Sequence, residues 1–504
     1  MDTMKDDCGA AATTPHDSND LLHLSATRIA ALIRRRDVSP VEVVKTHIER
    51  ARYVNGKINA IAHERFSAAI DEAHKAEQQL MRGAPLGALH GVPCTVKEGL
   101  GFGGLPKTAG STLRRTHRAA CDATVVTRIR NAGGIVIALT NQSEMALWPA
   151  ADNLVYGRTE NPWRAGRTAG GSSGGEAALV AAGGSVFGIG TDGGGSIRIP
   201  AAYCGVFGHK PSSGLAPLTG HVPLDERFET WPGAQAMARY FSPGPITRRA
   251  EDLMLMLRVI AGPDDVDRNV RVCSMHEPSL KRLDGLRVLV CDSPSPSWFR
   301  SVKGAGSAMV RRAASALESL GASIVPWTDP LLTRAFEIWV ATIASTRGPT
   351  MQTMIGQGRP PSLVCEMAYL FAGEPRHTLA AWLTCASERW LMPCPSKQRQ
   401  LQRDGAILLR RLRHAMGPNG ILLLPPVRGE APGHHHPMLY PRDIGLCALF
   451  NALELPATVA PVSQGEHGLP LSVQIVGPHG GDHLTLSAAL GIEQTLGAWR
   501  MPNV

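Results

Sequence analysis

Two glycine-rich turns, each carrying a serine, constrain this chain more than any other feature. The first covers residues 170–176 (GGSSGGE) and the second covers residues 191–198 (TDGGGSIR). One helical segment and one strand-like segment separate them. Successive glycine amides can point the same way and approach a ligand closely, as in anion-binding nests. We therefore expect backbone N–H groups to converge on a ligand where these two turns meet.

Two other interpretations of these turns were weighed. A phosphate-binding loop of the Walker type needs Gly-Lys-Ser/Thr at its end, and neither turn is followed by that tripeptide. The first turn also satisfies G-x-S-x-G through Gly170, Ser172 and Gly174, which is the nucleophile elbow of α/β-hydrolases. In that alternative Ser172 is the nucleophile and a downstream acid and histidine complete the site. It stays open here, although it assigns no role to the second turn.

Lys97 is the candidate base for a serine nucleophile. A serine hydroxyl needs a base to react at neutral pH. Lys97 follows the strand-like run 91–96 (GVPCTV), so it is expected at the edge of a sheet, where active sites form. Burial disfavours the ammonium form and lowers the pKa of a lysine, which lets the neutral amine accept a proton.

The remainder of the chain predicts a large α/β fold, because short apolar runs alternate with helical segments. We expect a mobile tail over residues 1–20 and one domain over residues 21–504, an α/β/α sandwich around a large mixed, mostly parallel sheet. Expected strands are 92–96, 135–139, 186–189, 287–291, 323–325, 421–424, 457–460 and 472–476. Expected helices are 21–36, 40–53, 68–81, the segment ending at Gly183, 305–320, and much of 333–395.

Two helix starts carry the signal of a capping box, in which the first side chain and the third helical residue bond each other's backbone N–H groups. One is Ser39 with Glu42, where Pro40 occupies the first helical position. The other is Ser173 with Glu176. The second box would place the first serine turn at the beginning of a helix.

Composition narrows the classes of partner. The 52 Lys and Arg exceed the 43 Asp and Glu, for a net charge of +9, but the basic residues form short clusters without interleaved aromatics. Solvated helix faces explain them better than nucleic acid does. The ten cysteines include no C-x-x-C pair, so we expect no metal site and no disulfide framework. No apolar run reaches about 18 residues, and the first 20 residues do not resemble a secretory signal. The expectation is a cytoplasmic protein that is not integral to a membrane.

Two further segments are ambiguous. The run His434-His435-His436 offers metal-ligating groups, but consecutive histidines on a loop flanked by Gly and Pro rarely give tetrahedral geometry. We expect a pocket-rim or structural role. Residues 333–395 are rich in Trp and Met, which favours packed core over an apolar substrate pocket. The members are Trp339, Met351, Met354, Met367, Trp382 and Trp390.

Several motifs together resemble the amidase signature family, in particular its fatty-acid amide hydrolases. They are Lys97, the two serine turns, and the segments 161–163 (NPW), 207–211 (FGHKP), 468–470 (GLP) and 473–478 (VQIVGP). The resemblance covers about residues 21–500. It implies a serine hydrolase that cleaves C–N bonds of amides through an acyl-enzyme and needs no cofactor.

The resemblance also implies roles for individual residues. Ser196 would be the nucleophile, and Ser172, preceded by a cis peptide bond, would relay protons to Lys97. An Asp192–Arg198 ion pair would stiffen the nucleophile turn. The oxyanion would be held by the amides of Gly193, Gly194, Gly195 and Ser196, and substrate by Met145, Ala146, Leu147 and Gly171.

The expected substrates are small aryl or acyl amides, with carbamates (urethanes) and esters because their carbonyls pass through similar tetrahedral states. Two alternatives remain: the glutaminase-type subunit of a tRNA amidotransferase, and a non-catalytic binding protein. A homodimer is left open. Gly193 replaces a larger residue of relatives and Ser472 stands where many have Gly, so we expect a wider or looser site.

Overall fold

An 11-stranded mixed sheet organises the part of the chain that the computed structural model describes, residues 18–294, 305–497 and 499–504. Its strand order is β1-β3-β2-β8-β10-β9-β14-β15-β13-β11-β12. The strands are β1 (Ile61–Glu64), β2 (Pro93–Lys97), β3 (Ile135–Thr140), β8 (Phe187–Asp192), β9 (Phe207–Lys210), β10 (Ser242–Thr247), β11 (Arg287–Val290), β12 (Ser323–Pro326), β13 (Gly420–Leu424), β14 (Ala457–Gln464) and β15 (Pro470–Val476). Short strands β4 to β7, between Asp152 and Thr168, form two small hairpins beside it.

Parallel pairing is confined to two blocks of this sheet. Strand β2 pairs in parallel with β3 and β8, and β11 pairs in parallel with β12 and β13. The strands between and beside these blocks pair antiparallel. The sheet is therefore mixed as expected, with a smaller parallel share than the apolar runs indicated, because buried antiparallel strands are as continuously apolar as parallel ones.

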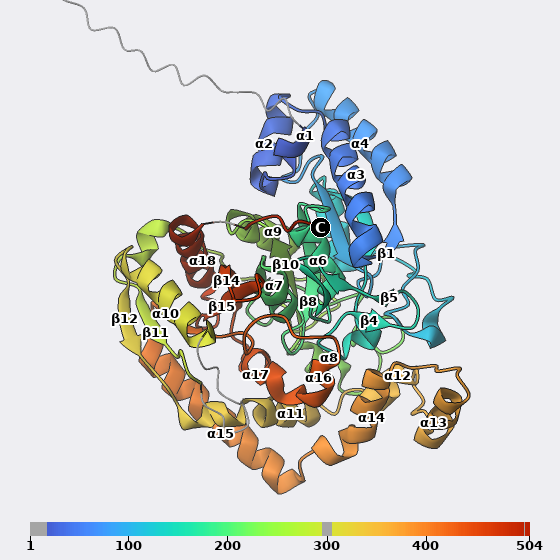
Figure 1. The fold of residues 1–504 in the computed structure, drawn as a ribbon, viewed down its shortest axis with the longest axis vertical. Helices are drawn as coiled ribbons and strands as arrows, with labels where there is room; N and C mark the ends of the chain where they lie inside the picture. The colour runs from blue at the N-terminus through green and yellow to red at the C-terminus, as the bar shows by residue number, and fades with distance from the viewer. Residues whose placement is uncertain (1–17, 295–304, 498) are drawn as a thin grey trace, which may run out of the picture.

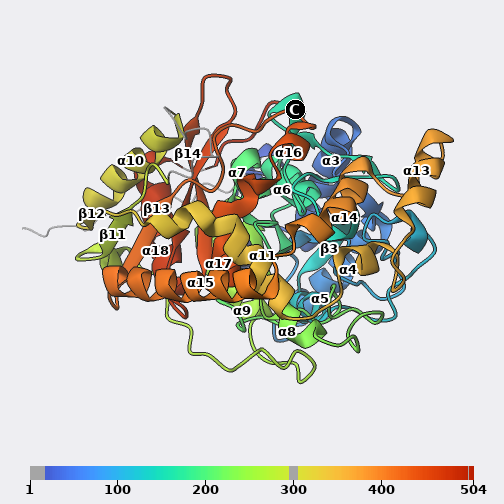
Figure 2. The ribbon, with the colours of Figure 1, turned by 90° about the horizontal axis from the view of Figure 1, so that it is seen from below.

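Side-chain alternation along the strands creates a hydrophobic core on each face of the sheet. In β13, Ile421 and Leu423 pack with α9 (Glu251–Ile260), α10 (Ala305–Glu318) and α18 (Asp482–Leu496). Leu422 and Leu424 face the opposite core, with α11 (Ala335–Ser345), α15 (Pro395–Met416) and α17 (Gly445–Ala452). Helices on both faces confirm the expected α/β/α architecture, which Figures 1 and 2 show from two directions.

The N-terminal helices gather at the β1 end of the sheet, and β11, β12 and α10 lie at the other end (Figure 1). The expected helix over 21–36 is divided into α1 (Ser18–Leu21) and α2 (Ala26–Arg35), because Ser25 caps the second helix by accepting a hydrogen bond from Arg28 N–H. Helix α3 (Pro40–Ile58) is longer than expected, and α4 covers Phe66–Met81. Of the expected tail, residues 1–17 lie outside the described residues.

Helices α12 (Met351–Ile355), α13 (Leu363–Phe371) and α14 (Leu379–Leu391) project from one corner of the molecule (Figure 1). The Trp and Met residues of 333–395 fall into two groups, one exposed to solvent and one lining a cavity. Met367 and Trp390 are exposed, whereas Trp339, Met351 and Met354 line a cavity near the serine turns. Among the described helices, none combines the length and apolar character needed to cross a bilayer.

Strand β8 shows how the sequence lets a helix approach the sheet at the site. Phe187 and Ile189 face one core, while Gly188 and Gly190 face α6 (Gly174–Ala181). A Cβ at Gly188 would lie 1.8 Å from Glu176 Oε1, and one at Gly190 would lie 2.7 Å from Ser173 Oγ. The alternating glycines therefore allow the serine turn before α6 to rest directly on the strand that leads to Ser196.

Candidate active site

The two serine turns meet above the end of β2, where Lys97 emerges. Lys97 Nζ lies within hydrogen-bond distance of Ser172 Oγ, at 2.6 Å, and both side chains are fully buried. The alternation along β2 explains this direction: Cys94 and Val96 enter one core, so Thr95 and Lys97 point to the opposite face, toward α6. The alternation of side chains along β2 therefore brings Lys97 to Ser172, although the two residues are 75 positions apart in the sequence.

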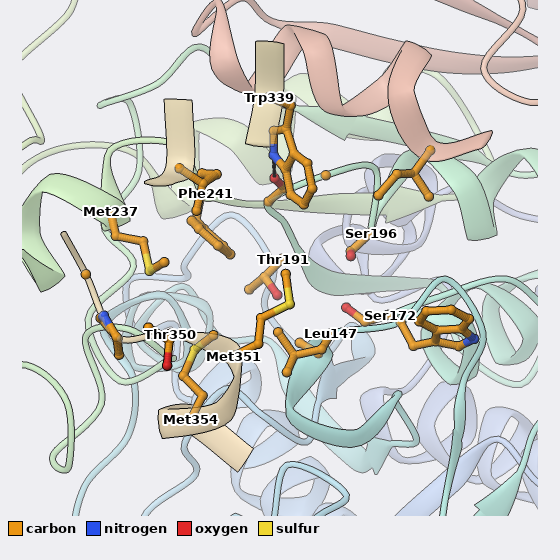
Figure 3. Close-up of a pocket in the computed structure, with 18 of the residues that line it drawn as sticks. Leu147, Ser172, Thr191, Ser196, Met237, Phe241, Trp339, Thr350, Met351 and Met354 are labelled. Atoms are coloured by element: carbon orange, nitrogen blue, oxygen red, sulfur yellow. Dashed lines mark hydrogen bonds between the residues drawn. The ribbon is translucent and has the colours of Figure 1, made fainter. Parts of the chain in front are cut away.

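Ser196 lies on the other side of Ser172. The backbone links their turns, because Ser173 N–H donates to the carbonyl oxygen of Ser196 at 3.1 Å. The hydroxyl groups of Ser172 and Ser196 point toward one another in Figure 3, and both line the same cavity. Within the described chain, Ser196 Oγ forms no hydrogen bond, and Ser196 is partly exposed to the cavity. The peptide bond Gly171–Ser172 is cis.

Burial controls the protonation of Lys97. It lowers the pKa of Lys97 to about 7, although the negative charges of Asp192 and Glu176 act in the opposite direction. Burial likewise raises the pKa of Glu176 to about 8, against hydrogen bonds from Thr140 and Thr95 and the charge of Lys97. Near neutral pH, a substantial fraction of Lys97 is therefore an uncharged amine.

The Glu176 contacts overturn the expected capping box at this helix. Ser173 makes no capping hydrogen bond to α6, and its hydroxyl instead lies 3.4 Å from Thr191 N. Glu176 bonds Thr95 and Thr140 across the sheet. Tertiary partners have replaced the local pair. At the other expected box, Ser39 caps α3 through Val41 N–H but donates its hydroxyl proton to Glu77, 2.5 Å away.

A buried ion pair stabilises the second serine turn, residues 191–198. Arg198 Nη2 lies 2.8 Å from Asp192 Oδ1, and Arg198 also donates to the side chains of Asn451 and Gln474. Burial alone would raise the pKa of Asp192, but Arg198 holds it well below its usual range. The pair is fully buried, and it joins the turn to α17 and β15.

Only some backbone N–H groups of residues 193–196 are hydrogen-bonded within the described protein. Gly195 N–H donates to Asp192 Oδ1 at 2.7 Å, so it is not free to hold an oxyanion as expected. In the described part of the chain, the N–H groups of Gly193, Gly194 and Ser196 find no protein acceptor. Trp339 Nε1 donates to Gly193 O at 2.8 Å, drawn as a dashed line in Figure 3. Because a trans peptide is planar, this contact turns the Gly194 N–H the opposite way.

A cavity of about 210 Å³ opens beside the serines. Figure 3 shows that its walls are largely apolar, with Ser172, Thr191 and Ser196 as polar groups among them. The principal apolar side chains are Leu147, Met237, Phe241, Trp339, Met351 and Met354. Ala146, Leu147 and Gly171 line it as expected, but Met145 does not. Met145 is buried and packs with Phe228 and Met354, and its backbone is left-handed (φ 49°).

The two departures from the family pattern do not widen the site. A Cβ at Gly193 would lie 2.2 Å from the ring of Phe241, so Phe241 fills the space that a larger residue would take. Ser472 is buried in β15, where its hydroxyl donates to Ala202 O at 3.3 Å, and it does not line the cavity. The structure therefore does not support the expectation of a looser site: Phe241 occupies the space at Gly193, and Ser472 lies away from the cavity.

Sequence reasoning missed several residues that support the site. Thr191 contacts Lys97, and His221 contacts Thr191. Trp339 lines the cavity, although the Trp- and Met-rich segment that contains it favours packed core. Glu144 accepts hydrogen bonds from His377 Nδ1 at 2.7 Å and Thr378 N–H at 2.8 Å, which ties α14 to the loop carrying Ala146 and Leu147. In the sequence, Glu144 stands next to the expected pocket residues, which is only a weak indication of a role. Its partners His377 and Thr378 become apparent only in the fold.

The histidine run makes structural contacts. His434 Nε2 lies 3.0 Å from Glu160 Oε2, and the rings of His436 and Tyr440 are 4.6 Å apart. The described residues contain no group of three or more His, Cys, Asp or Glu side chains that could hold a metal ion.

Known proteins are similar to this chain over most of its length. A family model described as Amidase matches residues 42–486. The chain is 36% identical to fatty-acid amide hydrolase 2-B of Danio rerio over 97% of this chain and 93% of that protein, and 34% identical to fatty-acid amide hydrolase 2 of Homo sapiens over 98% and 93%.

A solved structure of 6-aminohexanoate cyclic dimer hydrolase complexed with substrate superposes with a TM-score of 0.77 and 25% identity, over 95% of this chain and 98% of that chain. The matches span nearly the whole chain and include both serine turns. The chain belongs to the amidase family, and it is a hydrolase of amide C–N bonds.

Proposed function

We propose that Ser196 is the nucleophile of a Ser-Ser-Lys triad that hydrolyses amides through an acyl-enzyme. The observation that carries this is the buried contact between Lys97 Nζ and Ser172 Oγ, 2.6 Å long, with the Ser196 hydroxyl facing Ser172 from the cavity. A neutral amine in contact with a hydroxyl is arranged to accept its proton.

The proton path follows the order of the three side chains. Lys97 takes the proton of Ser172, Ser172 takes that of Ser196, and Ser196 Oγ attacks the substrate carbonyl carbon. The carbonyl electron pair moves onto its oxygen, which the free amides of Gly193, Gly194 and Ser196 would hold. Collapse breaks the C–N bond, and the leaving nitrogen receives a proton back through Ser172, since an amine leaves poorly without one. Water then releases the acyl group.

The cavity favours substrates with an apolar acyl or aryl group. Its walls of Leu147, Phe241, Trp339 and Met351 offer dispersion and aromatic contacts. Carbamates and esters present the same type of carbonyl, so we propose them as further substrates. We retain one domain over residues 21–504, and a homodimer is compatible with the proposal.

Two alternatives predict different outcomes. In the nucleophile-elbow esterase, Ser172 would be acylated with a histidine as base; its hydroxyl instead meets Lys97. In the amidotransferase subunit, activity would depend on protein partners and tRNA. Turnover of a simple aryl amide by the purified chain alone would contradict that role.

A fluorophosphonate probe tests the assignment directly. We expect one adduct, on Ser196, identified by peptide mass spectrometry. The Ser196→Ala variant should lose labelling and lower kcat by about 10⁵-fold or more. Ser212→Ala, which removes a buried serine away from the cavity, is the matched control and should keep activity. An adduct on Ser172, or turnover by Ser196→Ala, would overturn the proposal.

A further inference from the structure

Lys97 has a second hydrogen-bond partner, which leads away from Ser172. Lys97 Nζ lies 2.9 Å from Thr191 Oγ1, and Thr191 Oγ1 lies 3.2 Å from His221 Nε2. The other ring nitrogen, His221 Nδ1, lies 2.8 Å from the carbonyl oxygen of Val222. Thr191 and His221 are 2% and 3% exposed, so this chain of contacts is almost sealed from bulk solvent.

Counting donors fixes the direction of every bond in this chain. A backbone carbonyl only accepts, so His221 Nδ1 must carry a proton. Burial and the positive charges of Lys97, Lys107 and Arg114 hold the pKa of His221 well below its usual value, so the ring is neutral and Nε2 is a bare acceptor. The Thr191 hydroxyl therefore donates its single proton to Nε2. Its oxygen is left to accept an N–H from Lys97.

This direction matters because a neutral amine has two N–H groups and one lone pair. With one N–H held by Thr191, rotation about the Cε–Nζ bond is restricted and the lone pair can face Ser172 Oγ. A Thr191 hydroxyl without a fixed acceptor could instead turn its own proton toward that lone pair and compete with Ser172.

We propose that His221 is a positioning residue which, through the Thr191 hydroxyl, reserves the lone pair of Lys97 for Ser172. The inference rests on the proposed role of Lys97 as the base. His221 and Thr191 act through Lys97 and exchange no proton with substrate.

The kinetic test compares His221→Phe, Thr191→Val, the double variant and Thr191→Ser, with an aryl amide such as p-nitroacetanilide. We expect His221→Phe and Thr191→Val each to lower kcat about tenfold with less than a twofold change in KM, because each replacement is similar in size to the side chain it removes from the cavity wall. Thr191→Ser keeps the hydroxyl and should restore most of the activity. The double variant should be no slower than Thr191→Val, because both changes act on one hydroxyl.

The pH profile separates positioning from a merely structural role. The acidic groups that face Lys97, Asp192 and Glu176, remain in every variant. Loss of a well-oriented acceptor destabilises the ammonium form of Lys97 more than the amine, so the acid limb of kcat/KM should move to lower pH in His221→Phe and Thr191→Val. His90→Phe is the matched control: it removes another buried histidine that bonds a backbone carbonyl, and it should leave the limb in place.

A spectroscopic measurement gives the result without any turnover. In the full chain labelled with ¹⁵N-histidine, the His221 signal, assigned by its loss in His221→Phe or in His221→Gln, should be that of the neutral ring protonated at Nδ1. A ring protonated at Nε2, an unchanged kcat in His221→Phe, or additive losses in the double variant would overturn the inference. If one of these results is found and Ser196→Ala is inactive, the role of His221 is rejected but the proposed triad is not. If Ser196→Ala is active, the triad itself is rejected.

Discussion

Lys97 can accept a proton only as a neutral amine, so its protonation should set the pH dependence of the reaction. Burial lowers its pKa to about 7. As the base we propose, Lys97 would be charged and inactive below that pH and neutral above it. We therefore expect kcat/KM to rise with pH up to about pH 7 and then to level off, measured from pH 5 to pH 9.

Lys210 provides the control for this prediction. It is also fully buried, and burial together with Arg198 lowers its pKa to about 7, but its Nζ donates to Pro211 O rather than to a serine. Lys210→Met should keep the acid limb where it is. A profile that is flat through pH 7, or a limb that disappears in Lys210→Met, would assign the titration to another group.

The close approach of Phe241 to Gly193 leads to a prediction about substrate binding. A Cβ at Gly193 would overlap the Phe241 ring at 2.2 Å, so Gly193→Ala should push the ring into the cavity. We expect KM for an aryl amide to rise about tenfold. The second change Phe241→Leu makes room for the new methyl group and should bring KM most of the way back. Equal KM values for wild type and Gly193→Ala would show that the ring does not limit the cavity.

At the scale of elements, α11 contacts the second serine turn through a hydrogen bond from Trp339. Trp339 Nε1 holds the carbonyl of Gly193 and thereby orients the Gly194 N–H that we assign to the oxyanion. Trp339→Phe keeps most of the aromatic surface but loses the donor. We expect kcat to fall about fivefold, the usual effect of one neutral hydrogen bond, with binding of an apolar competitive inhibitor unchanged. Weaker inhibitor binding with an unchanged kcat would mean that Trp339 serves only as part of the cavity wall.

The elements also show where sequence patterns were sufficient and where they were not. Apolar runs located β3, β13 and β15 closely, because each strand is buried on both faces. Strand β10 (SPGPIT) lies between β8 and β9, yet its two prolines and a glycine are typical of a turn. The capping box before α6 failed because Glu176 found better partners across the sheet.

At the scale of the whole molecule, the Asp192–Arg198 pair links the centre of the chain to its C-terminal third. Arg198 contacts α17 and β15 as well as Asp192, and all of these groups are buried. Arg198→Met would leave the buried Asp192 carboxylate without its ion-pair partner, which costs about 3–5 kcal/mol. We expect a clearly lower urea midpoint of unfolding.

The double variant Asp192→Asn/Arg198→Met tests the cause of that loss. It removes both charges, so it should recover part of the stability lost by Arg198→Met alone. An equal loss in the single and double variants would mean that the hydrogen bonds of Arg198 to α17 and β15 matter more than the charge of Asp192.

The sequence by itself determined the chemistry and the class of fold. Two kinds of feature can be recognised from the sequence alone because they are local: the serine turns of residues 170–176 and 191–198, and Lys97 after a strand-like apolar run. Only the tertiary structure decided that Gly195 N–H is engaged by Asp192, that Phe241 fills the space at Gly193, that Met145 does not line the cavity, and that His221 stands behind Lys97. Phe241 and His221 come from segments distant in sequence from the groups they contact, and no periodicity along the chain encodes which segments will meet.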